Sequence, residues 1–265
     1  MKAIVVAAGM GRRLSPYTEQ MPKCLVPVGD RSILQWQLEA FREHGIDDIV
    51  IIRGYLAEVL EQRHQELGPG VRFVTNDEYQ TNNILQSLFC AEQSITGDLL
   101  ISYSDIIYTH DVVRRAVESA GDIALIIDRD FANIYEGRTD HPLQEAEVSD
   151  LFPNGHVKRV GKRALPAAEA WGEFIGLMKL SATGASWVRQ AWDELQESYR
   201  GRSEEPFQRA NTFRNAYLTD LLQHLIDSGR PVTPVEIRGC WREIDTVQDL
   251  HRARALLRSS QENWK

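Results

Sequence analysis

Short apolar runs rich in β-branched residues recur through the first half of the chain, each bounded by polar residues or glycine. They cover residues 4–6, 49–52, 71–74, 99–101 and 123–127. Runs of this kind predict buried strands. Apolar residues at helical spacing predict helices between the strands, within residues 34–45, 56–67 and 85–89. Strands that alternate with helices are typical of a mostly parallel sheet.

The alternation becomes less regular after residue 128. Residues 135–142 are polar and irregular, residues 148–160 indicate a hairpin, and residues 174–180 indicate a further strand. Two helices and a final strand-turn-helix unit are expected after them. No repeat of fixed period and no low-complexity linker divides the chain. We therefore expect one α/β domain over residues 1–265: a Rossmann-like, mostly parallel sheet flanked by helices, with an inserted substrate-binding portion.

The charge of the chain limits its partners. Its 265 residues include 30 Lys and Arg against 38 Asp and Glu, a formal net charge of −8 at pH 7. This balance argues against a surface that binds nucleic acid or anionic lipid, so an anionic substrate needs a local cationic patch. The longest fully apolar run, residues 3–8, is far shorter than the roughly 20 residues of a membrane helix. No signal-peptide pattern follows it, and we expect a cytoplasmic protein without a membrane span.

A loop of sequence Ala-Ala-Gly-Met-Gly-Arg-Arg-Leu, residues 7–14, directly follows the first strand. Ligands of open α/β sheets bind at the carboxyl ends of the strands, where this loop lies. Many strand-to-helix turns use glycine for backbone reasons alone. However, position 14 lacks the third glycine of a dinucleotide fingerprint, and the Gly-Lys-Ser/Thr of a Walker A loop is absent. The glycines, with Arg13 and Lys23, indicate a site for the phosphates of a nucleoside triphosphate.

This loop, extended by Ser-Pro-Tyr-Thr and followed by Met-Pro-Lys-Cys-Leu at residues 21–25, resembles the signature of the nucleotidylyltransferase superfamily. Residues 135–142 and 172–177 resemble nucleotidyltransferases that accompany phosphonate biosynthesis. The resemblance implies a single GT-A-like nucleotidyltransferase domain. Its nucleotide-binding half would be residues 1–128, and residues 129–265 would bind the acceptor and supply the second metal ligand.

The same resemblance assigns roles within the loop. It implies that the segment of Ala8, Gly9 and Gly11 wraps the triphosphate. Arg13 would contact the triphosphate, and Lys23 would bridge the phosphates of nucleotide and acceptor. Both cations are therefore expected to take part in catalysis.

A second nucleotide-binding segment is expected at Thr81, Asn82 and Asn83, because this stretch resembles the part of phosphocholine cytidylyltransferases that lies against the base. Hydroxyl and amide groups can read the carbonyl and amino edge of a pyrimidine. Asn83 could equally cap the helix that follows it. The resemblance favours CTP as the nucleotide.

Three carboxylates are candidates for a metal site. Asp105 comes just past the strand that begins at residue 99, whereas Glu243 and Asp245 lie two residues apart on an extended segment and so face one side. Nucleotidyl transfer brings the negative charges of the attacking oxygen and the departing pyrophosphate close together, and a divalent cation is required to neutralise them. Mg²⁺ prefers hard oxygen ligands such as carboxylates. The resemblance implies that Asp105 and Asp245 hold Mg²⁺. Glu243 is a third candidate ligand, although an exposed acid on a strand is the alternative.

Candidates for binding the acceptor's anion lie in the second half. Lys162 resembles a family lysine that reaches the acceptor phosphate and acts in catalysis. The alternative is a solvated lysine in a turn. Arg138 and His141 lie in a polar loop, where they could bind an anion or hold the loop together.

A cationic end of the acceptor has its own candidates. Glu173 could face a cationic head group, or form a structural salt bridge. Tyr135, Trp171 and Trp241 could provide aromatic walls for an amine through cation–π contact, although aromatic residues more often pack in a core.

The expected function is Mg²⁺-dependent transfer from CTP to a small phosphate or phosphonate acceptor of the phosphocholine or 2-aminoethylphosphonate type, with release of pyrophosphate. A sugar-1-phosphate nucleotidylyltransferase is the alternative within enzymes. A nucleotide-binding regulatory subunit is the alternative outside them, and the joint presence of Arg13, Lys23, Asp105 and Asp245 argues against it. A homodimer is compatible with the sequence.

Overall fold

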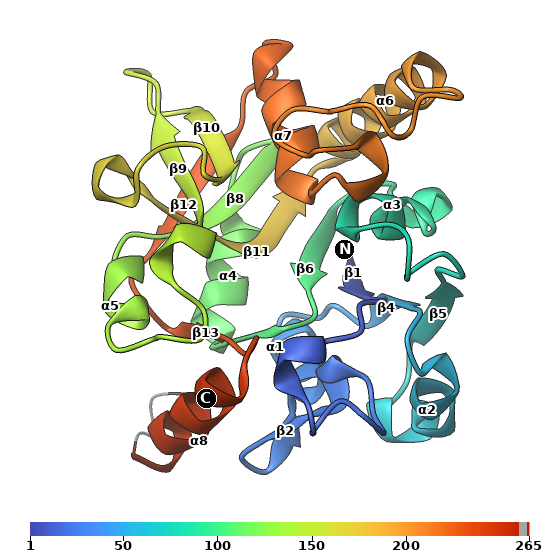
Figure 1. Cartoon of the computed structure of the whole chain (residues 1–265), viewed down its shortest axis with the longest axis vertical. Coiled ribbons are helices and arrows are strands. Elements are labelled where there is room, and N and C mark those ends of the chain that lie inside the picture. The colour runs from blue at the N-terminus through green and yellow to red at the C-terminus, as the bar shows by residue number, and fades with distance from the viewer. Residues whose placement is uncertain (260–263, 265) are drawn as a thin grey trace.

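The computed structural model describes residues 1–259 and residue 264, and its centre is a nine-stranded sheet with helices on both faces (Figure 1). In chain order, the strands of this sheet are β1 (Lys2–Ala7), β4 (Asp48–Arg53), β5 (Val71–Thr75), β6 (Leu99–Tyr103), β8 (Ile123–Asp128), β9 (Glu147–Leu151), β10 (Val157–Lys162), β11 (Gly172–Leu180) and β12 (Thr233–Ile237). Seven of them follow the order β10-β9-β11-β6-β1-β4-β5, while β8 pairs with β11 and β12. Two small ribbons pair β2 (Pro27–Val28) with β3 (Arg31–Ser32) and β7 (Ile106–Tyr108) with β13 (Trp241–Glu243).

Helices cover the sheet on two sides. They are α1 (Ile33–Glu43), α2 (Ala57–Gln62), α3 (Ile84–Phe89), α4 (His110–Glu118), α5 (Phe131–Tyr135), α6 (Ala182–Ser198), α7 (Leu218–Asp227) and α8 (Val247–Ser259). Because side chains alternate along a strand, Ile4 and Val6 of β1 pack in the core with α3, α6 and α7, whereas Ala3 and Val5 pack with α1 and α4. Among the described residues, no helix has the length and apolar character needed to cross a membrane.

The predicted Rossmann-like α/β fold is confirmed, with a mixed sheet. The five strands predicted in the first half are β1, β4, β5, β6 and β8, and the first four run parallel to one another. The predicted hairpin is β9 with β10, and the further strand is β11. These three strands pair antiparallel, so the parallel part of the sheet is mainly its amino-terminal half.

The sequence pattern gives no residue range for strand β12, for helix α5 or for the short ribbon strands β2, β3 and β7. Strand β12 has no apolar run, contains Pro234, and pairs only with β8 at the edge of the sheet, where proline is tolerated. Helix α5 has five residues, too few to show a helical period.

Strand β11 creates an opening in the sheet. On one side it pairs with β8, and on the other it pairs first with β9, at residues 172–173, and then with β6, at residues 177–180. Between these pairings lies Gly176, with φ of +87°, where a Cβ would come within 2.5 Å of the Tyr103 ring. Strands β6 and β9 therefore diverge along β11, and the opening between them forms part of a cavity.

Candidate active site

A cavity of about 400 Å³ lies at the carboxyl ends of β1 and β6 and reaches the opening along β11. This position is where ligands bind in open α/β sheets, and the volume suits a small ligand. Most of the residues predicted for the site line it: Ala8, Gly9, Gly11, Arg13, Lys23, Asn82, Asn83, Asp105, Lys162, Glu173, Glu243 and Asp245. Thr81, Tyr135, Arg138, His141 and Trp171 are not among the lining residues, and their surroundings are described below.

The glycine loop borders the cavity after β1. Gly11 has φ of +58°, and a Cβ there would lie 2.9 Å from Lys23 Cβ, so glycine allows both the turn and the close approach of the lysine. A Cβ on Gly9 would meet no atom within 4 Å. Thr18 Oγ1 donates to the Gly11 carbonyl over 3.0 Å, which fixes the loop. The loop therefore exposes backbone to the cavity beside two cationic side chains, Arg13 and Lys23.

Lys23 lies between two carboxylates from distant segments. Its Nζ is 2.8 Å from Asp105 Oδ2 and 2.7 Å from Asp245 Oδ1. Burial alone would lower the pKa of Lys23, but attraction and hydrogen bonds from both aspartates raise it above its usual value. Lys23 is therefore a fixed positive charge that holds the end of β6 to the segment after β13.

Asp245 is surrounded by donors. Its other oxygen, Oδ2, pairs with the Arg13 guanidinium and accepts from His141 Nδ1 over 2.8 Å. Burial would raise the pKa of Asp245, but Lys23, His141 and Arg13 together hold it well below the usual range. Asp245 is therefore ionised throughout the neutral pH range.

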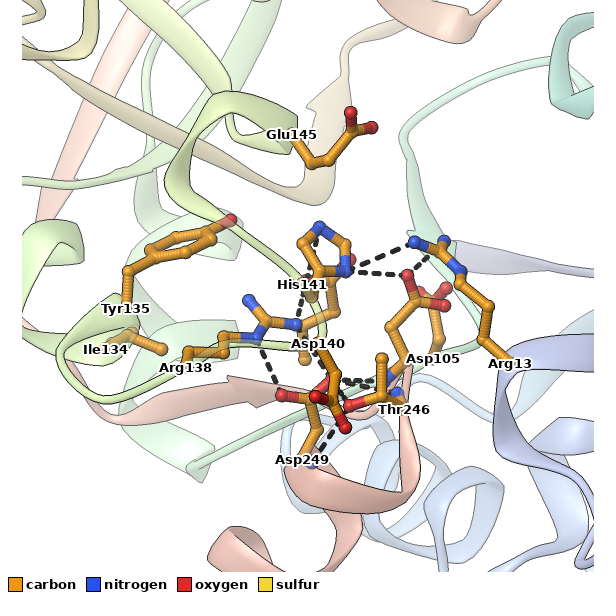
Figure 2. Close-up of polar contacts among 12 residues, drawn as sticks. Arg13, Asp105, Ile134, Tyr135, Arg138, Asp140, His141, Glu145, Thr246 and Asp249 are labelled. Atoms are coloured by element: carbon orange, nitrogen blue, oxygen red, sulfur yellow. Dashed lines mark hydrogen bonds and ion pairs between the residues drawn. The ribbon is translucent and has the colours of Figure 1, made fainter.

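On the side of Asp245 away from the cavity, a buried network of hydrogen bonds supports its carboxylate (Figure 2). Arg138 Nη2 donates to Glu243 Oε2 over 2.7 Å, and its Nε donates to Asp249 Oδ1 over 2.6 Å. Asp249 Oδ2 in turn accepts from the backbone N–H groups of Asp245 and Thr246. The Arg138 side chain is only 2% exposed. Both acids of this network thus hold the Arg138 side chain, which was predicted to bind the acceptor and is not among the residues that line the cavity.

His141 lies between Arg13 and Arg138, as Figure 2 shows, and does not line the cavity either. Its Nε2 is 3.7 Å from Glu243 Oε2, and its Nδ1 is 3.4 Å from an Arg13 nitrogen. One ligand atom each from His141, Glu243 and Asp245 lies within 4.8 Å of the others. Arg13 pairs with Asp245 and Arg138 pairs with Glu243, and His141 holds the Asp245 carboxylate from outside the cavity lining.

Amide groups form another part of the cavity wall. Asn82 and Asn76 exchange two side-chain hydrogen bonds of 2.9 and 3.2 Å, and Asn76 also donates to Ser87. Asn83 both lines the cavity and caps α3, since its Oδ1 accepts from the N–H of Ile84. Thr81 instead donates to the Glu78 carbonyl. Asn76, which the sequence analysis missed, fixes the orientation of Asn82.

Two glutamates that line the cavity, Glu145 and Glu147, were also missed by the sequence analysis. Lys162 Nζ is 3.3 Å from Glu145 Oε2 and 5.0 Å from the centre of the Tyr217 ring. Glu147 is buried, and its two oxygens accept from Tyr103 and Thr219 hydroxyl groups over 3.0 and 3.2 Å. Alternation of side chains along β9 could have indicated Glu147, but no motif marks it.

Glu173 lies on β11 where the sheet opens. It is 4% exposed, and its Oε1 accepts from the Tyr135 hydroxyl over 2.6 Å. Its Oε2 is buried and has no hydrogen-bond partner among the described residues. Burial raises the pKa of Glu173 well above its usual value, and nearby Glu243 raises it further. Tyr135 thus holds Glu173 through its hydroxyl group and does not itself line the cavity. Trp171 lies against the Arg129 guanidinium and does not line the cavity either.

The environment of Glu147 leads to a prediction about stability. Burial raises the pKa of Glu147 from 4.5 to about 7, although Lys162 and the two hydroxyl groups lower it. An acid whose pKa is higher in the folded state loses stability as pH rises through that window. We expect Glu147→Gln, which cannot ionise, to become more stable relative to wild type between pH 5 and pH 8, by up to about 3 kcal/mol.

Thermal unfolding of both proteins at pH 5 and pH 8 measures this difference. The matched control is Glu169→Gln, which replaces an exposed glutamate. Its melting temperature should follow that of wild type at both pH values. Equal pH dependence of wild type and Glu147→Gln would contradict the interpretation.

Known proteins are similar to this chain over nearly its whole length. A family model described as a MobA-like NTP transferase domain matches residues 3–263. The chain is 32% identical over 256 residues to CTP:phosphoglutamine cytidylyltransferase of Campylobacter jejuni, covering 94% of this chain and 98% of that protein. It is 26% identical over 252 residues to 2-aminoethylphosphonate cytidylyltransferase of Lancefieldella rimae, covering 94% and 89%.

Solved structures show the same architecture. CTP:phosphocholine cytidylyltransferase from Streptococcus pneumoniae superposes with a TM-score of 0.72 at 24% identity, covering 97% of this chain and 98% of that one. At this identity the likeness concerns the fold, and it confirms the predicted nucleotidyltransferase architecture.

Proposed function

The chain belongs to the family of MobA-like NTP transferase domains and is a nucleotidyltransferase, and we propose that it transfers the cytidylyl group of CTP to a small phosphorylated or phosphonate head group. An acceptor oxygen would form a bond to the α-phosphorus of CTP while the bond to the β-phosphate breaks and pyrophosphate leaves. Because that oxygen is already anionic at neutral pH, the reaction depends on positioning and charge neutralisation rather than on a general base.

The central observation is the place of Lys23 in the cavity. It lies between Asp105 and Asp245, in a cavity that Asn82, Asn83 and Lys162 also line. A triphosphate bound in this cavity would meet this cation. The arrangement supports a reaction that joins two phosphorus-bearing substrates at the centre of the cavity.

The cations have separate tasks in this proposal. Arg13 would bind the triphosphate, and Lys23 would neutralise charge on both substrates as the new bond forms. Lys162 would bind the acceptor's phosphate or phosphonate, since it lines the cavity beside Tyr217. Arginine and lysine both suit such multiply charged groups.

The carboxylates fit a divalent cation. Asp105 Oδ1 is buried and accepts no hydrogen bond from the described residues. The Lys23 ammonium lies between Asp105 and Asp245, so the two carboxylates already have a positive charge between them. We propose that these two aspartates, with Glu243 as a third candidate, hold Mg²⁺, for which carboxylate oxygens are suitable ligands. When bound, Mg²⁺ would neutralise the charge that accumulates on the phosphates.

The acceptor proposed here is a small head group with one anionic and one cationic end. Lys162 would bind the anionic end and Glu173 would face the cationic end, because both line the cavity. The relatives named above act, by their names, on phosphoglutamine and 2-aminoethylphosphonate, and each of these carries a single phosphorus group. A sugar 1-phosphate remains the alternative, and it has no cationic end for Glu173.

We expect CTP to be the preferred nucleotide, because the Asn76 contact fixes the orientation of the Asn82 amide, which would contact the base. The test is pyrophosphate release with CTP, UTP, ATP or dTTP in turn, at fixed 2-aminoethylphosphonate. CTP should give at least about tenfold higher kcat/KM than the others, and Asn82→Ala should lose most of this preference. Equal or faster turnover with ATP or dTTP, or use of hexose 1-phosphate in place of 2-aminoethylphosphonate, would contradict the proposal.

A further inference from the structure

Tyr135 and Trp171, two of the three aromatic residues predicted to wall the acceptor, and Tyr217 of the cavity lining lie against cations of the protein itself. The Arg138 guanidinium lies 4.8 Å from the centre of the Tyr135 ring, and the Arg129 guanidinium lies 4.2 Å from that of Trp171. Lys162 Nζ lies 5.0 Å from the centre of the Tyr217 ring. A quaternary ammonium group is recognised by open aromatic faces that surround it. Here a cation of the chain covers a face of each of these rings.

Trp241, the remaining aromatic candidate, does not change this picture. It is 2% exposed, and its Nε1 donates to Asp128 over 2.8 Å. Its ring is therefore fixed in the wall and offers little surface to a trimethylammonium group.

Glu173 offers a different kind of recognition. It lines the cavity, is 4% exposed, and has one buried oxygen, Oε2, without a hydrogen-bond partner among the described residues. The other oxygen is fixed by Tyr135, so the carboxyl group keeps its orientation. Buried polar atoms in proteins are nearly always hydrogen-bonded, so an atom of this kind in a cavity wall points to a ligand group that bonds to it.

We propose that Glu173 selects an acceptor whose cationic end is a primary ammonium group over one that ends in trimethylammonium. A primary ammonium group has three N–H donors and can bond to Oε2, whereas a trimethylammonium group has the same charge but no donor. The second group would leave Oε2 buried without a bond, and its methyl groups would keep the positive charge away from the oxygen. This inference rests on the proposed function and names the chemistry of its acceptor.

The experiment uses acceptors in which methyl groups replace the N–H groups of the ammonium one at a time. Phosphoethanolamine, its N-methyl and N,N-dimethyl derivatives, and phosphocholine all carry one phosphate and one cationic nitrogen, with three, two, one and no N–H donors at neutral pH. With CTP fixed, kcat/KM measured by pyrophosphate release should fall along the series, by at least about tenfold from the first member to the last. The fall should reside mainly in the acceptor's KM.

Variants separate a contact from a general structural effect. Glu173→Gln should raise the KM for phosphoethanolamine and flatten the series, while the KM for CTP stays as in wild type. Glu169→Gln, which changes an exposed glutamate outside the cavity lining, should keep the wild-type series.

Two results would overturn the inference in distinguishable ways. Equal kcat/KM along the series, or preference for phosphocholine, would refute selection by Glu173 while leaving cytidylyl transfer intact. Turnover of hexose 1-phosphate with none of the four acceptors used would refute the proposed function, and the inference with it.

Discussion

Replacement of Asp245 by Asn should lower kcat by about a hundredfold or more while the chain remains folded. Asp245 accepts from Lys23, Arg13 and His141, and its low pKa keeps it charged at every assay pH. The amide has nearly the same shape but no charge, so it can neither hold a divalent cation as strongly nor fix both cationic side chains.

The KM for CTP should rise little in this variant. Arg13 and Lys23 remain in the cavity with one less negative charge beside them, so they still attract the triphosphate. Steady-state kinetics at saturating Mg²⁺ separate the two parameters, and thermal unfolding checks the fold. The matched control is Asp111→Asn on α4, an exposed aspartate paired with Arg114 and Arg115, which should keep wild-type kinetics. Turnover of Asp245→Asn within about threefold of wild type would refute the assignment.

Lys23→Ala is the second substitution with a large expected effect. Lys23 is the buried cation that separates Asp105 from Asp245, so its removal leaves two carboxylates facing each other across the centre of the cavity. Its charge would also be absent where negative charge accumulates during transfer. We expect kcat to fall by about a hundredfold, with a smaller rise in the KM for CTP, because the contact strengthens as the new bond forms.

The control for this substitution is Lys158→Ala, since Lys158 lies exposed on β10. Both variants lose one positive charge, but only Lys23→Ala removes it from the cavity. An effect of Lys23→Ala confined to the KM for CTP would show that Lys23 contributes equally to substrate and transition-state binding.

Much of the fold could be predicted because its signals are local. The apolar runs of β1, β4, β6 and β8 are buried on both faces, so they read as continuous hydrophobic segments, whereas β5 at the edge of the sheet is only partly buried. Strand β12 escapes this rule, because an edge strand with one neighbour needs no apolar run. The opening along β11 could not be predicted either, since it depends on which strands pair with its two ends.

The candidate site likewise contains residues whose place could be predicted from the sequence and residues whose role could not. Lys23, Asp105 and Asp245 follow motifs and strand ends, and the structure brings them into direct contact. Arg138 and His141 lie in a motif too, but the motif does not show whether a side chain faces the ligand or supports a residue that does. That distinction depends on their pairing with Glu243, Asp245 and Asp249, which lie more than a hundred residues away in sequence.

Glu147 and Asn76 show a further limit of sequence reasoning. Each lies on or beside a strand without a motif, and each acquires its role from partners contributed by other segments. Partners such as Tyr103 and Thr219 become identifiable only when strand order and helix positions are known.

The most direct test of the account is to identify the product by phosphorus-31 NMR. CTP, Mg²⁺ and either 2-aminoethylphosphonate or phosphoethanolamine would be incubated with the protein, with Asp245→Asn as the inactive comparison. We expect two coupled doublets, one from the cytidylyl phosphorus and one from the acceptor phosphorus, together with an equal amount of pyrophosphate. Conversion of CTP to CMP or CDP without the doublets of a product that joins the cytidylyl and acceptor phosphorus, or no consumption of CTP with either acceptor, would contradict the proposal.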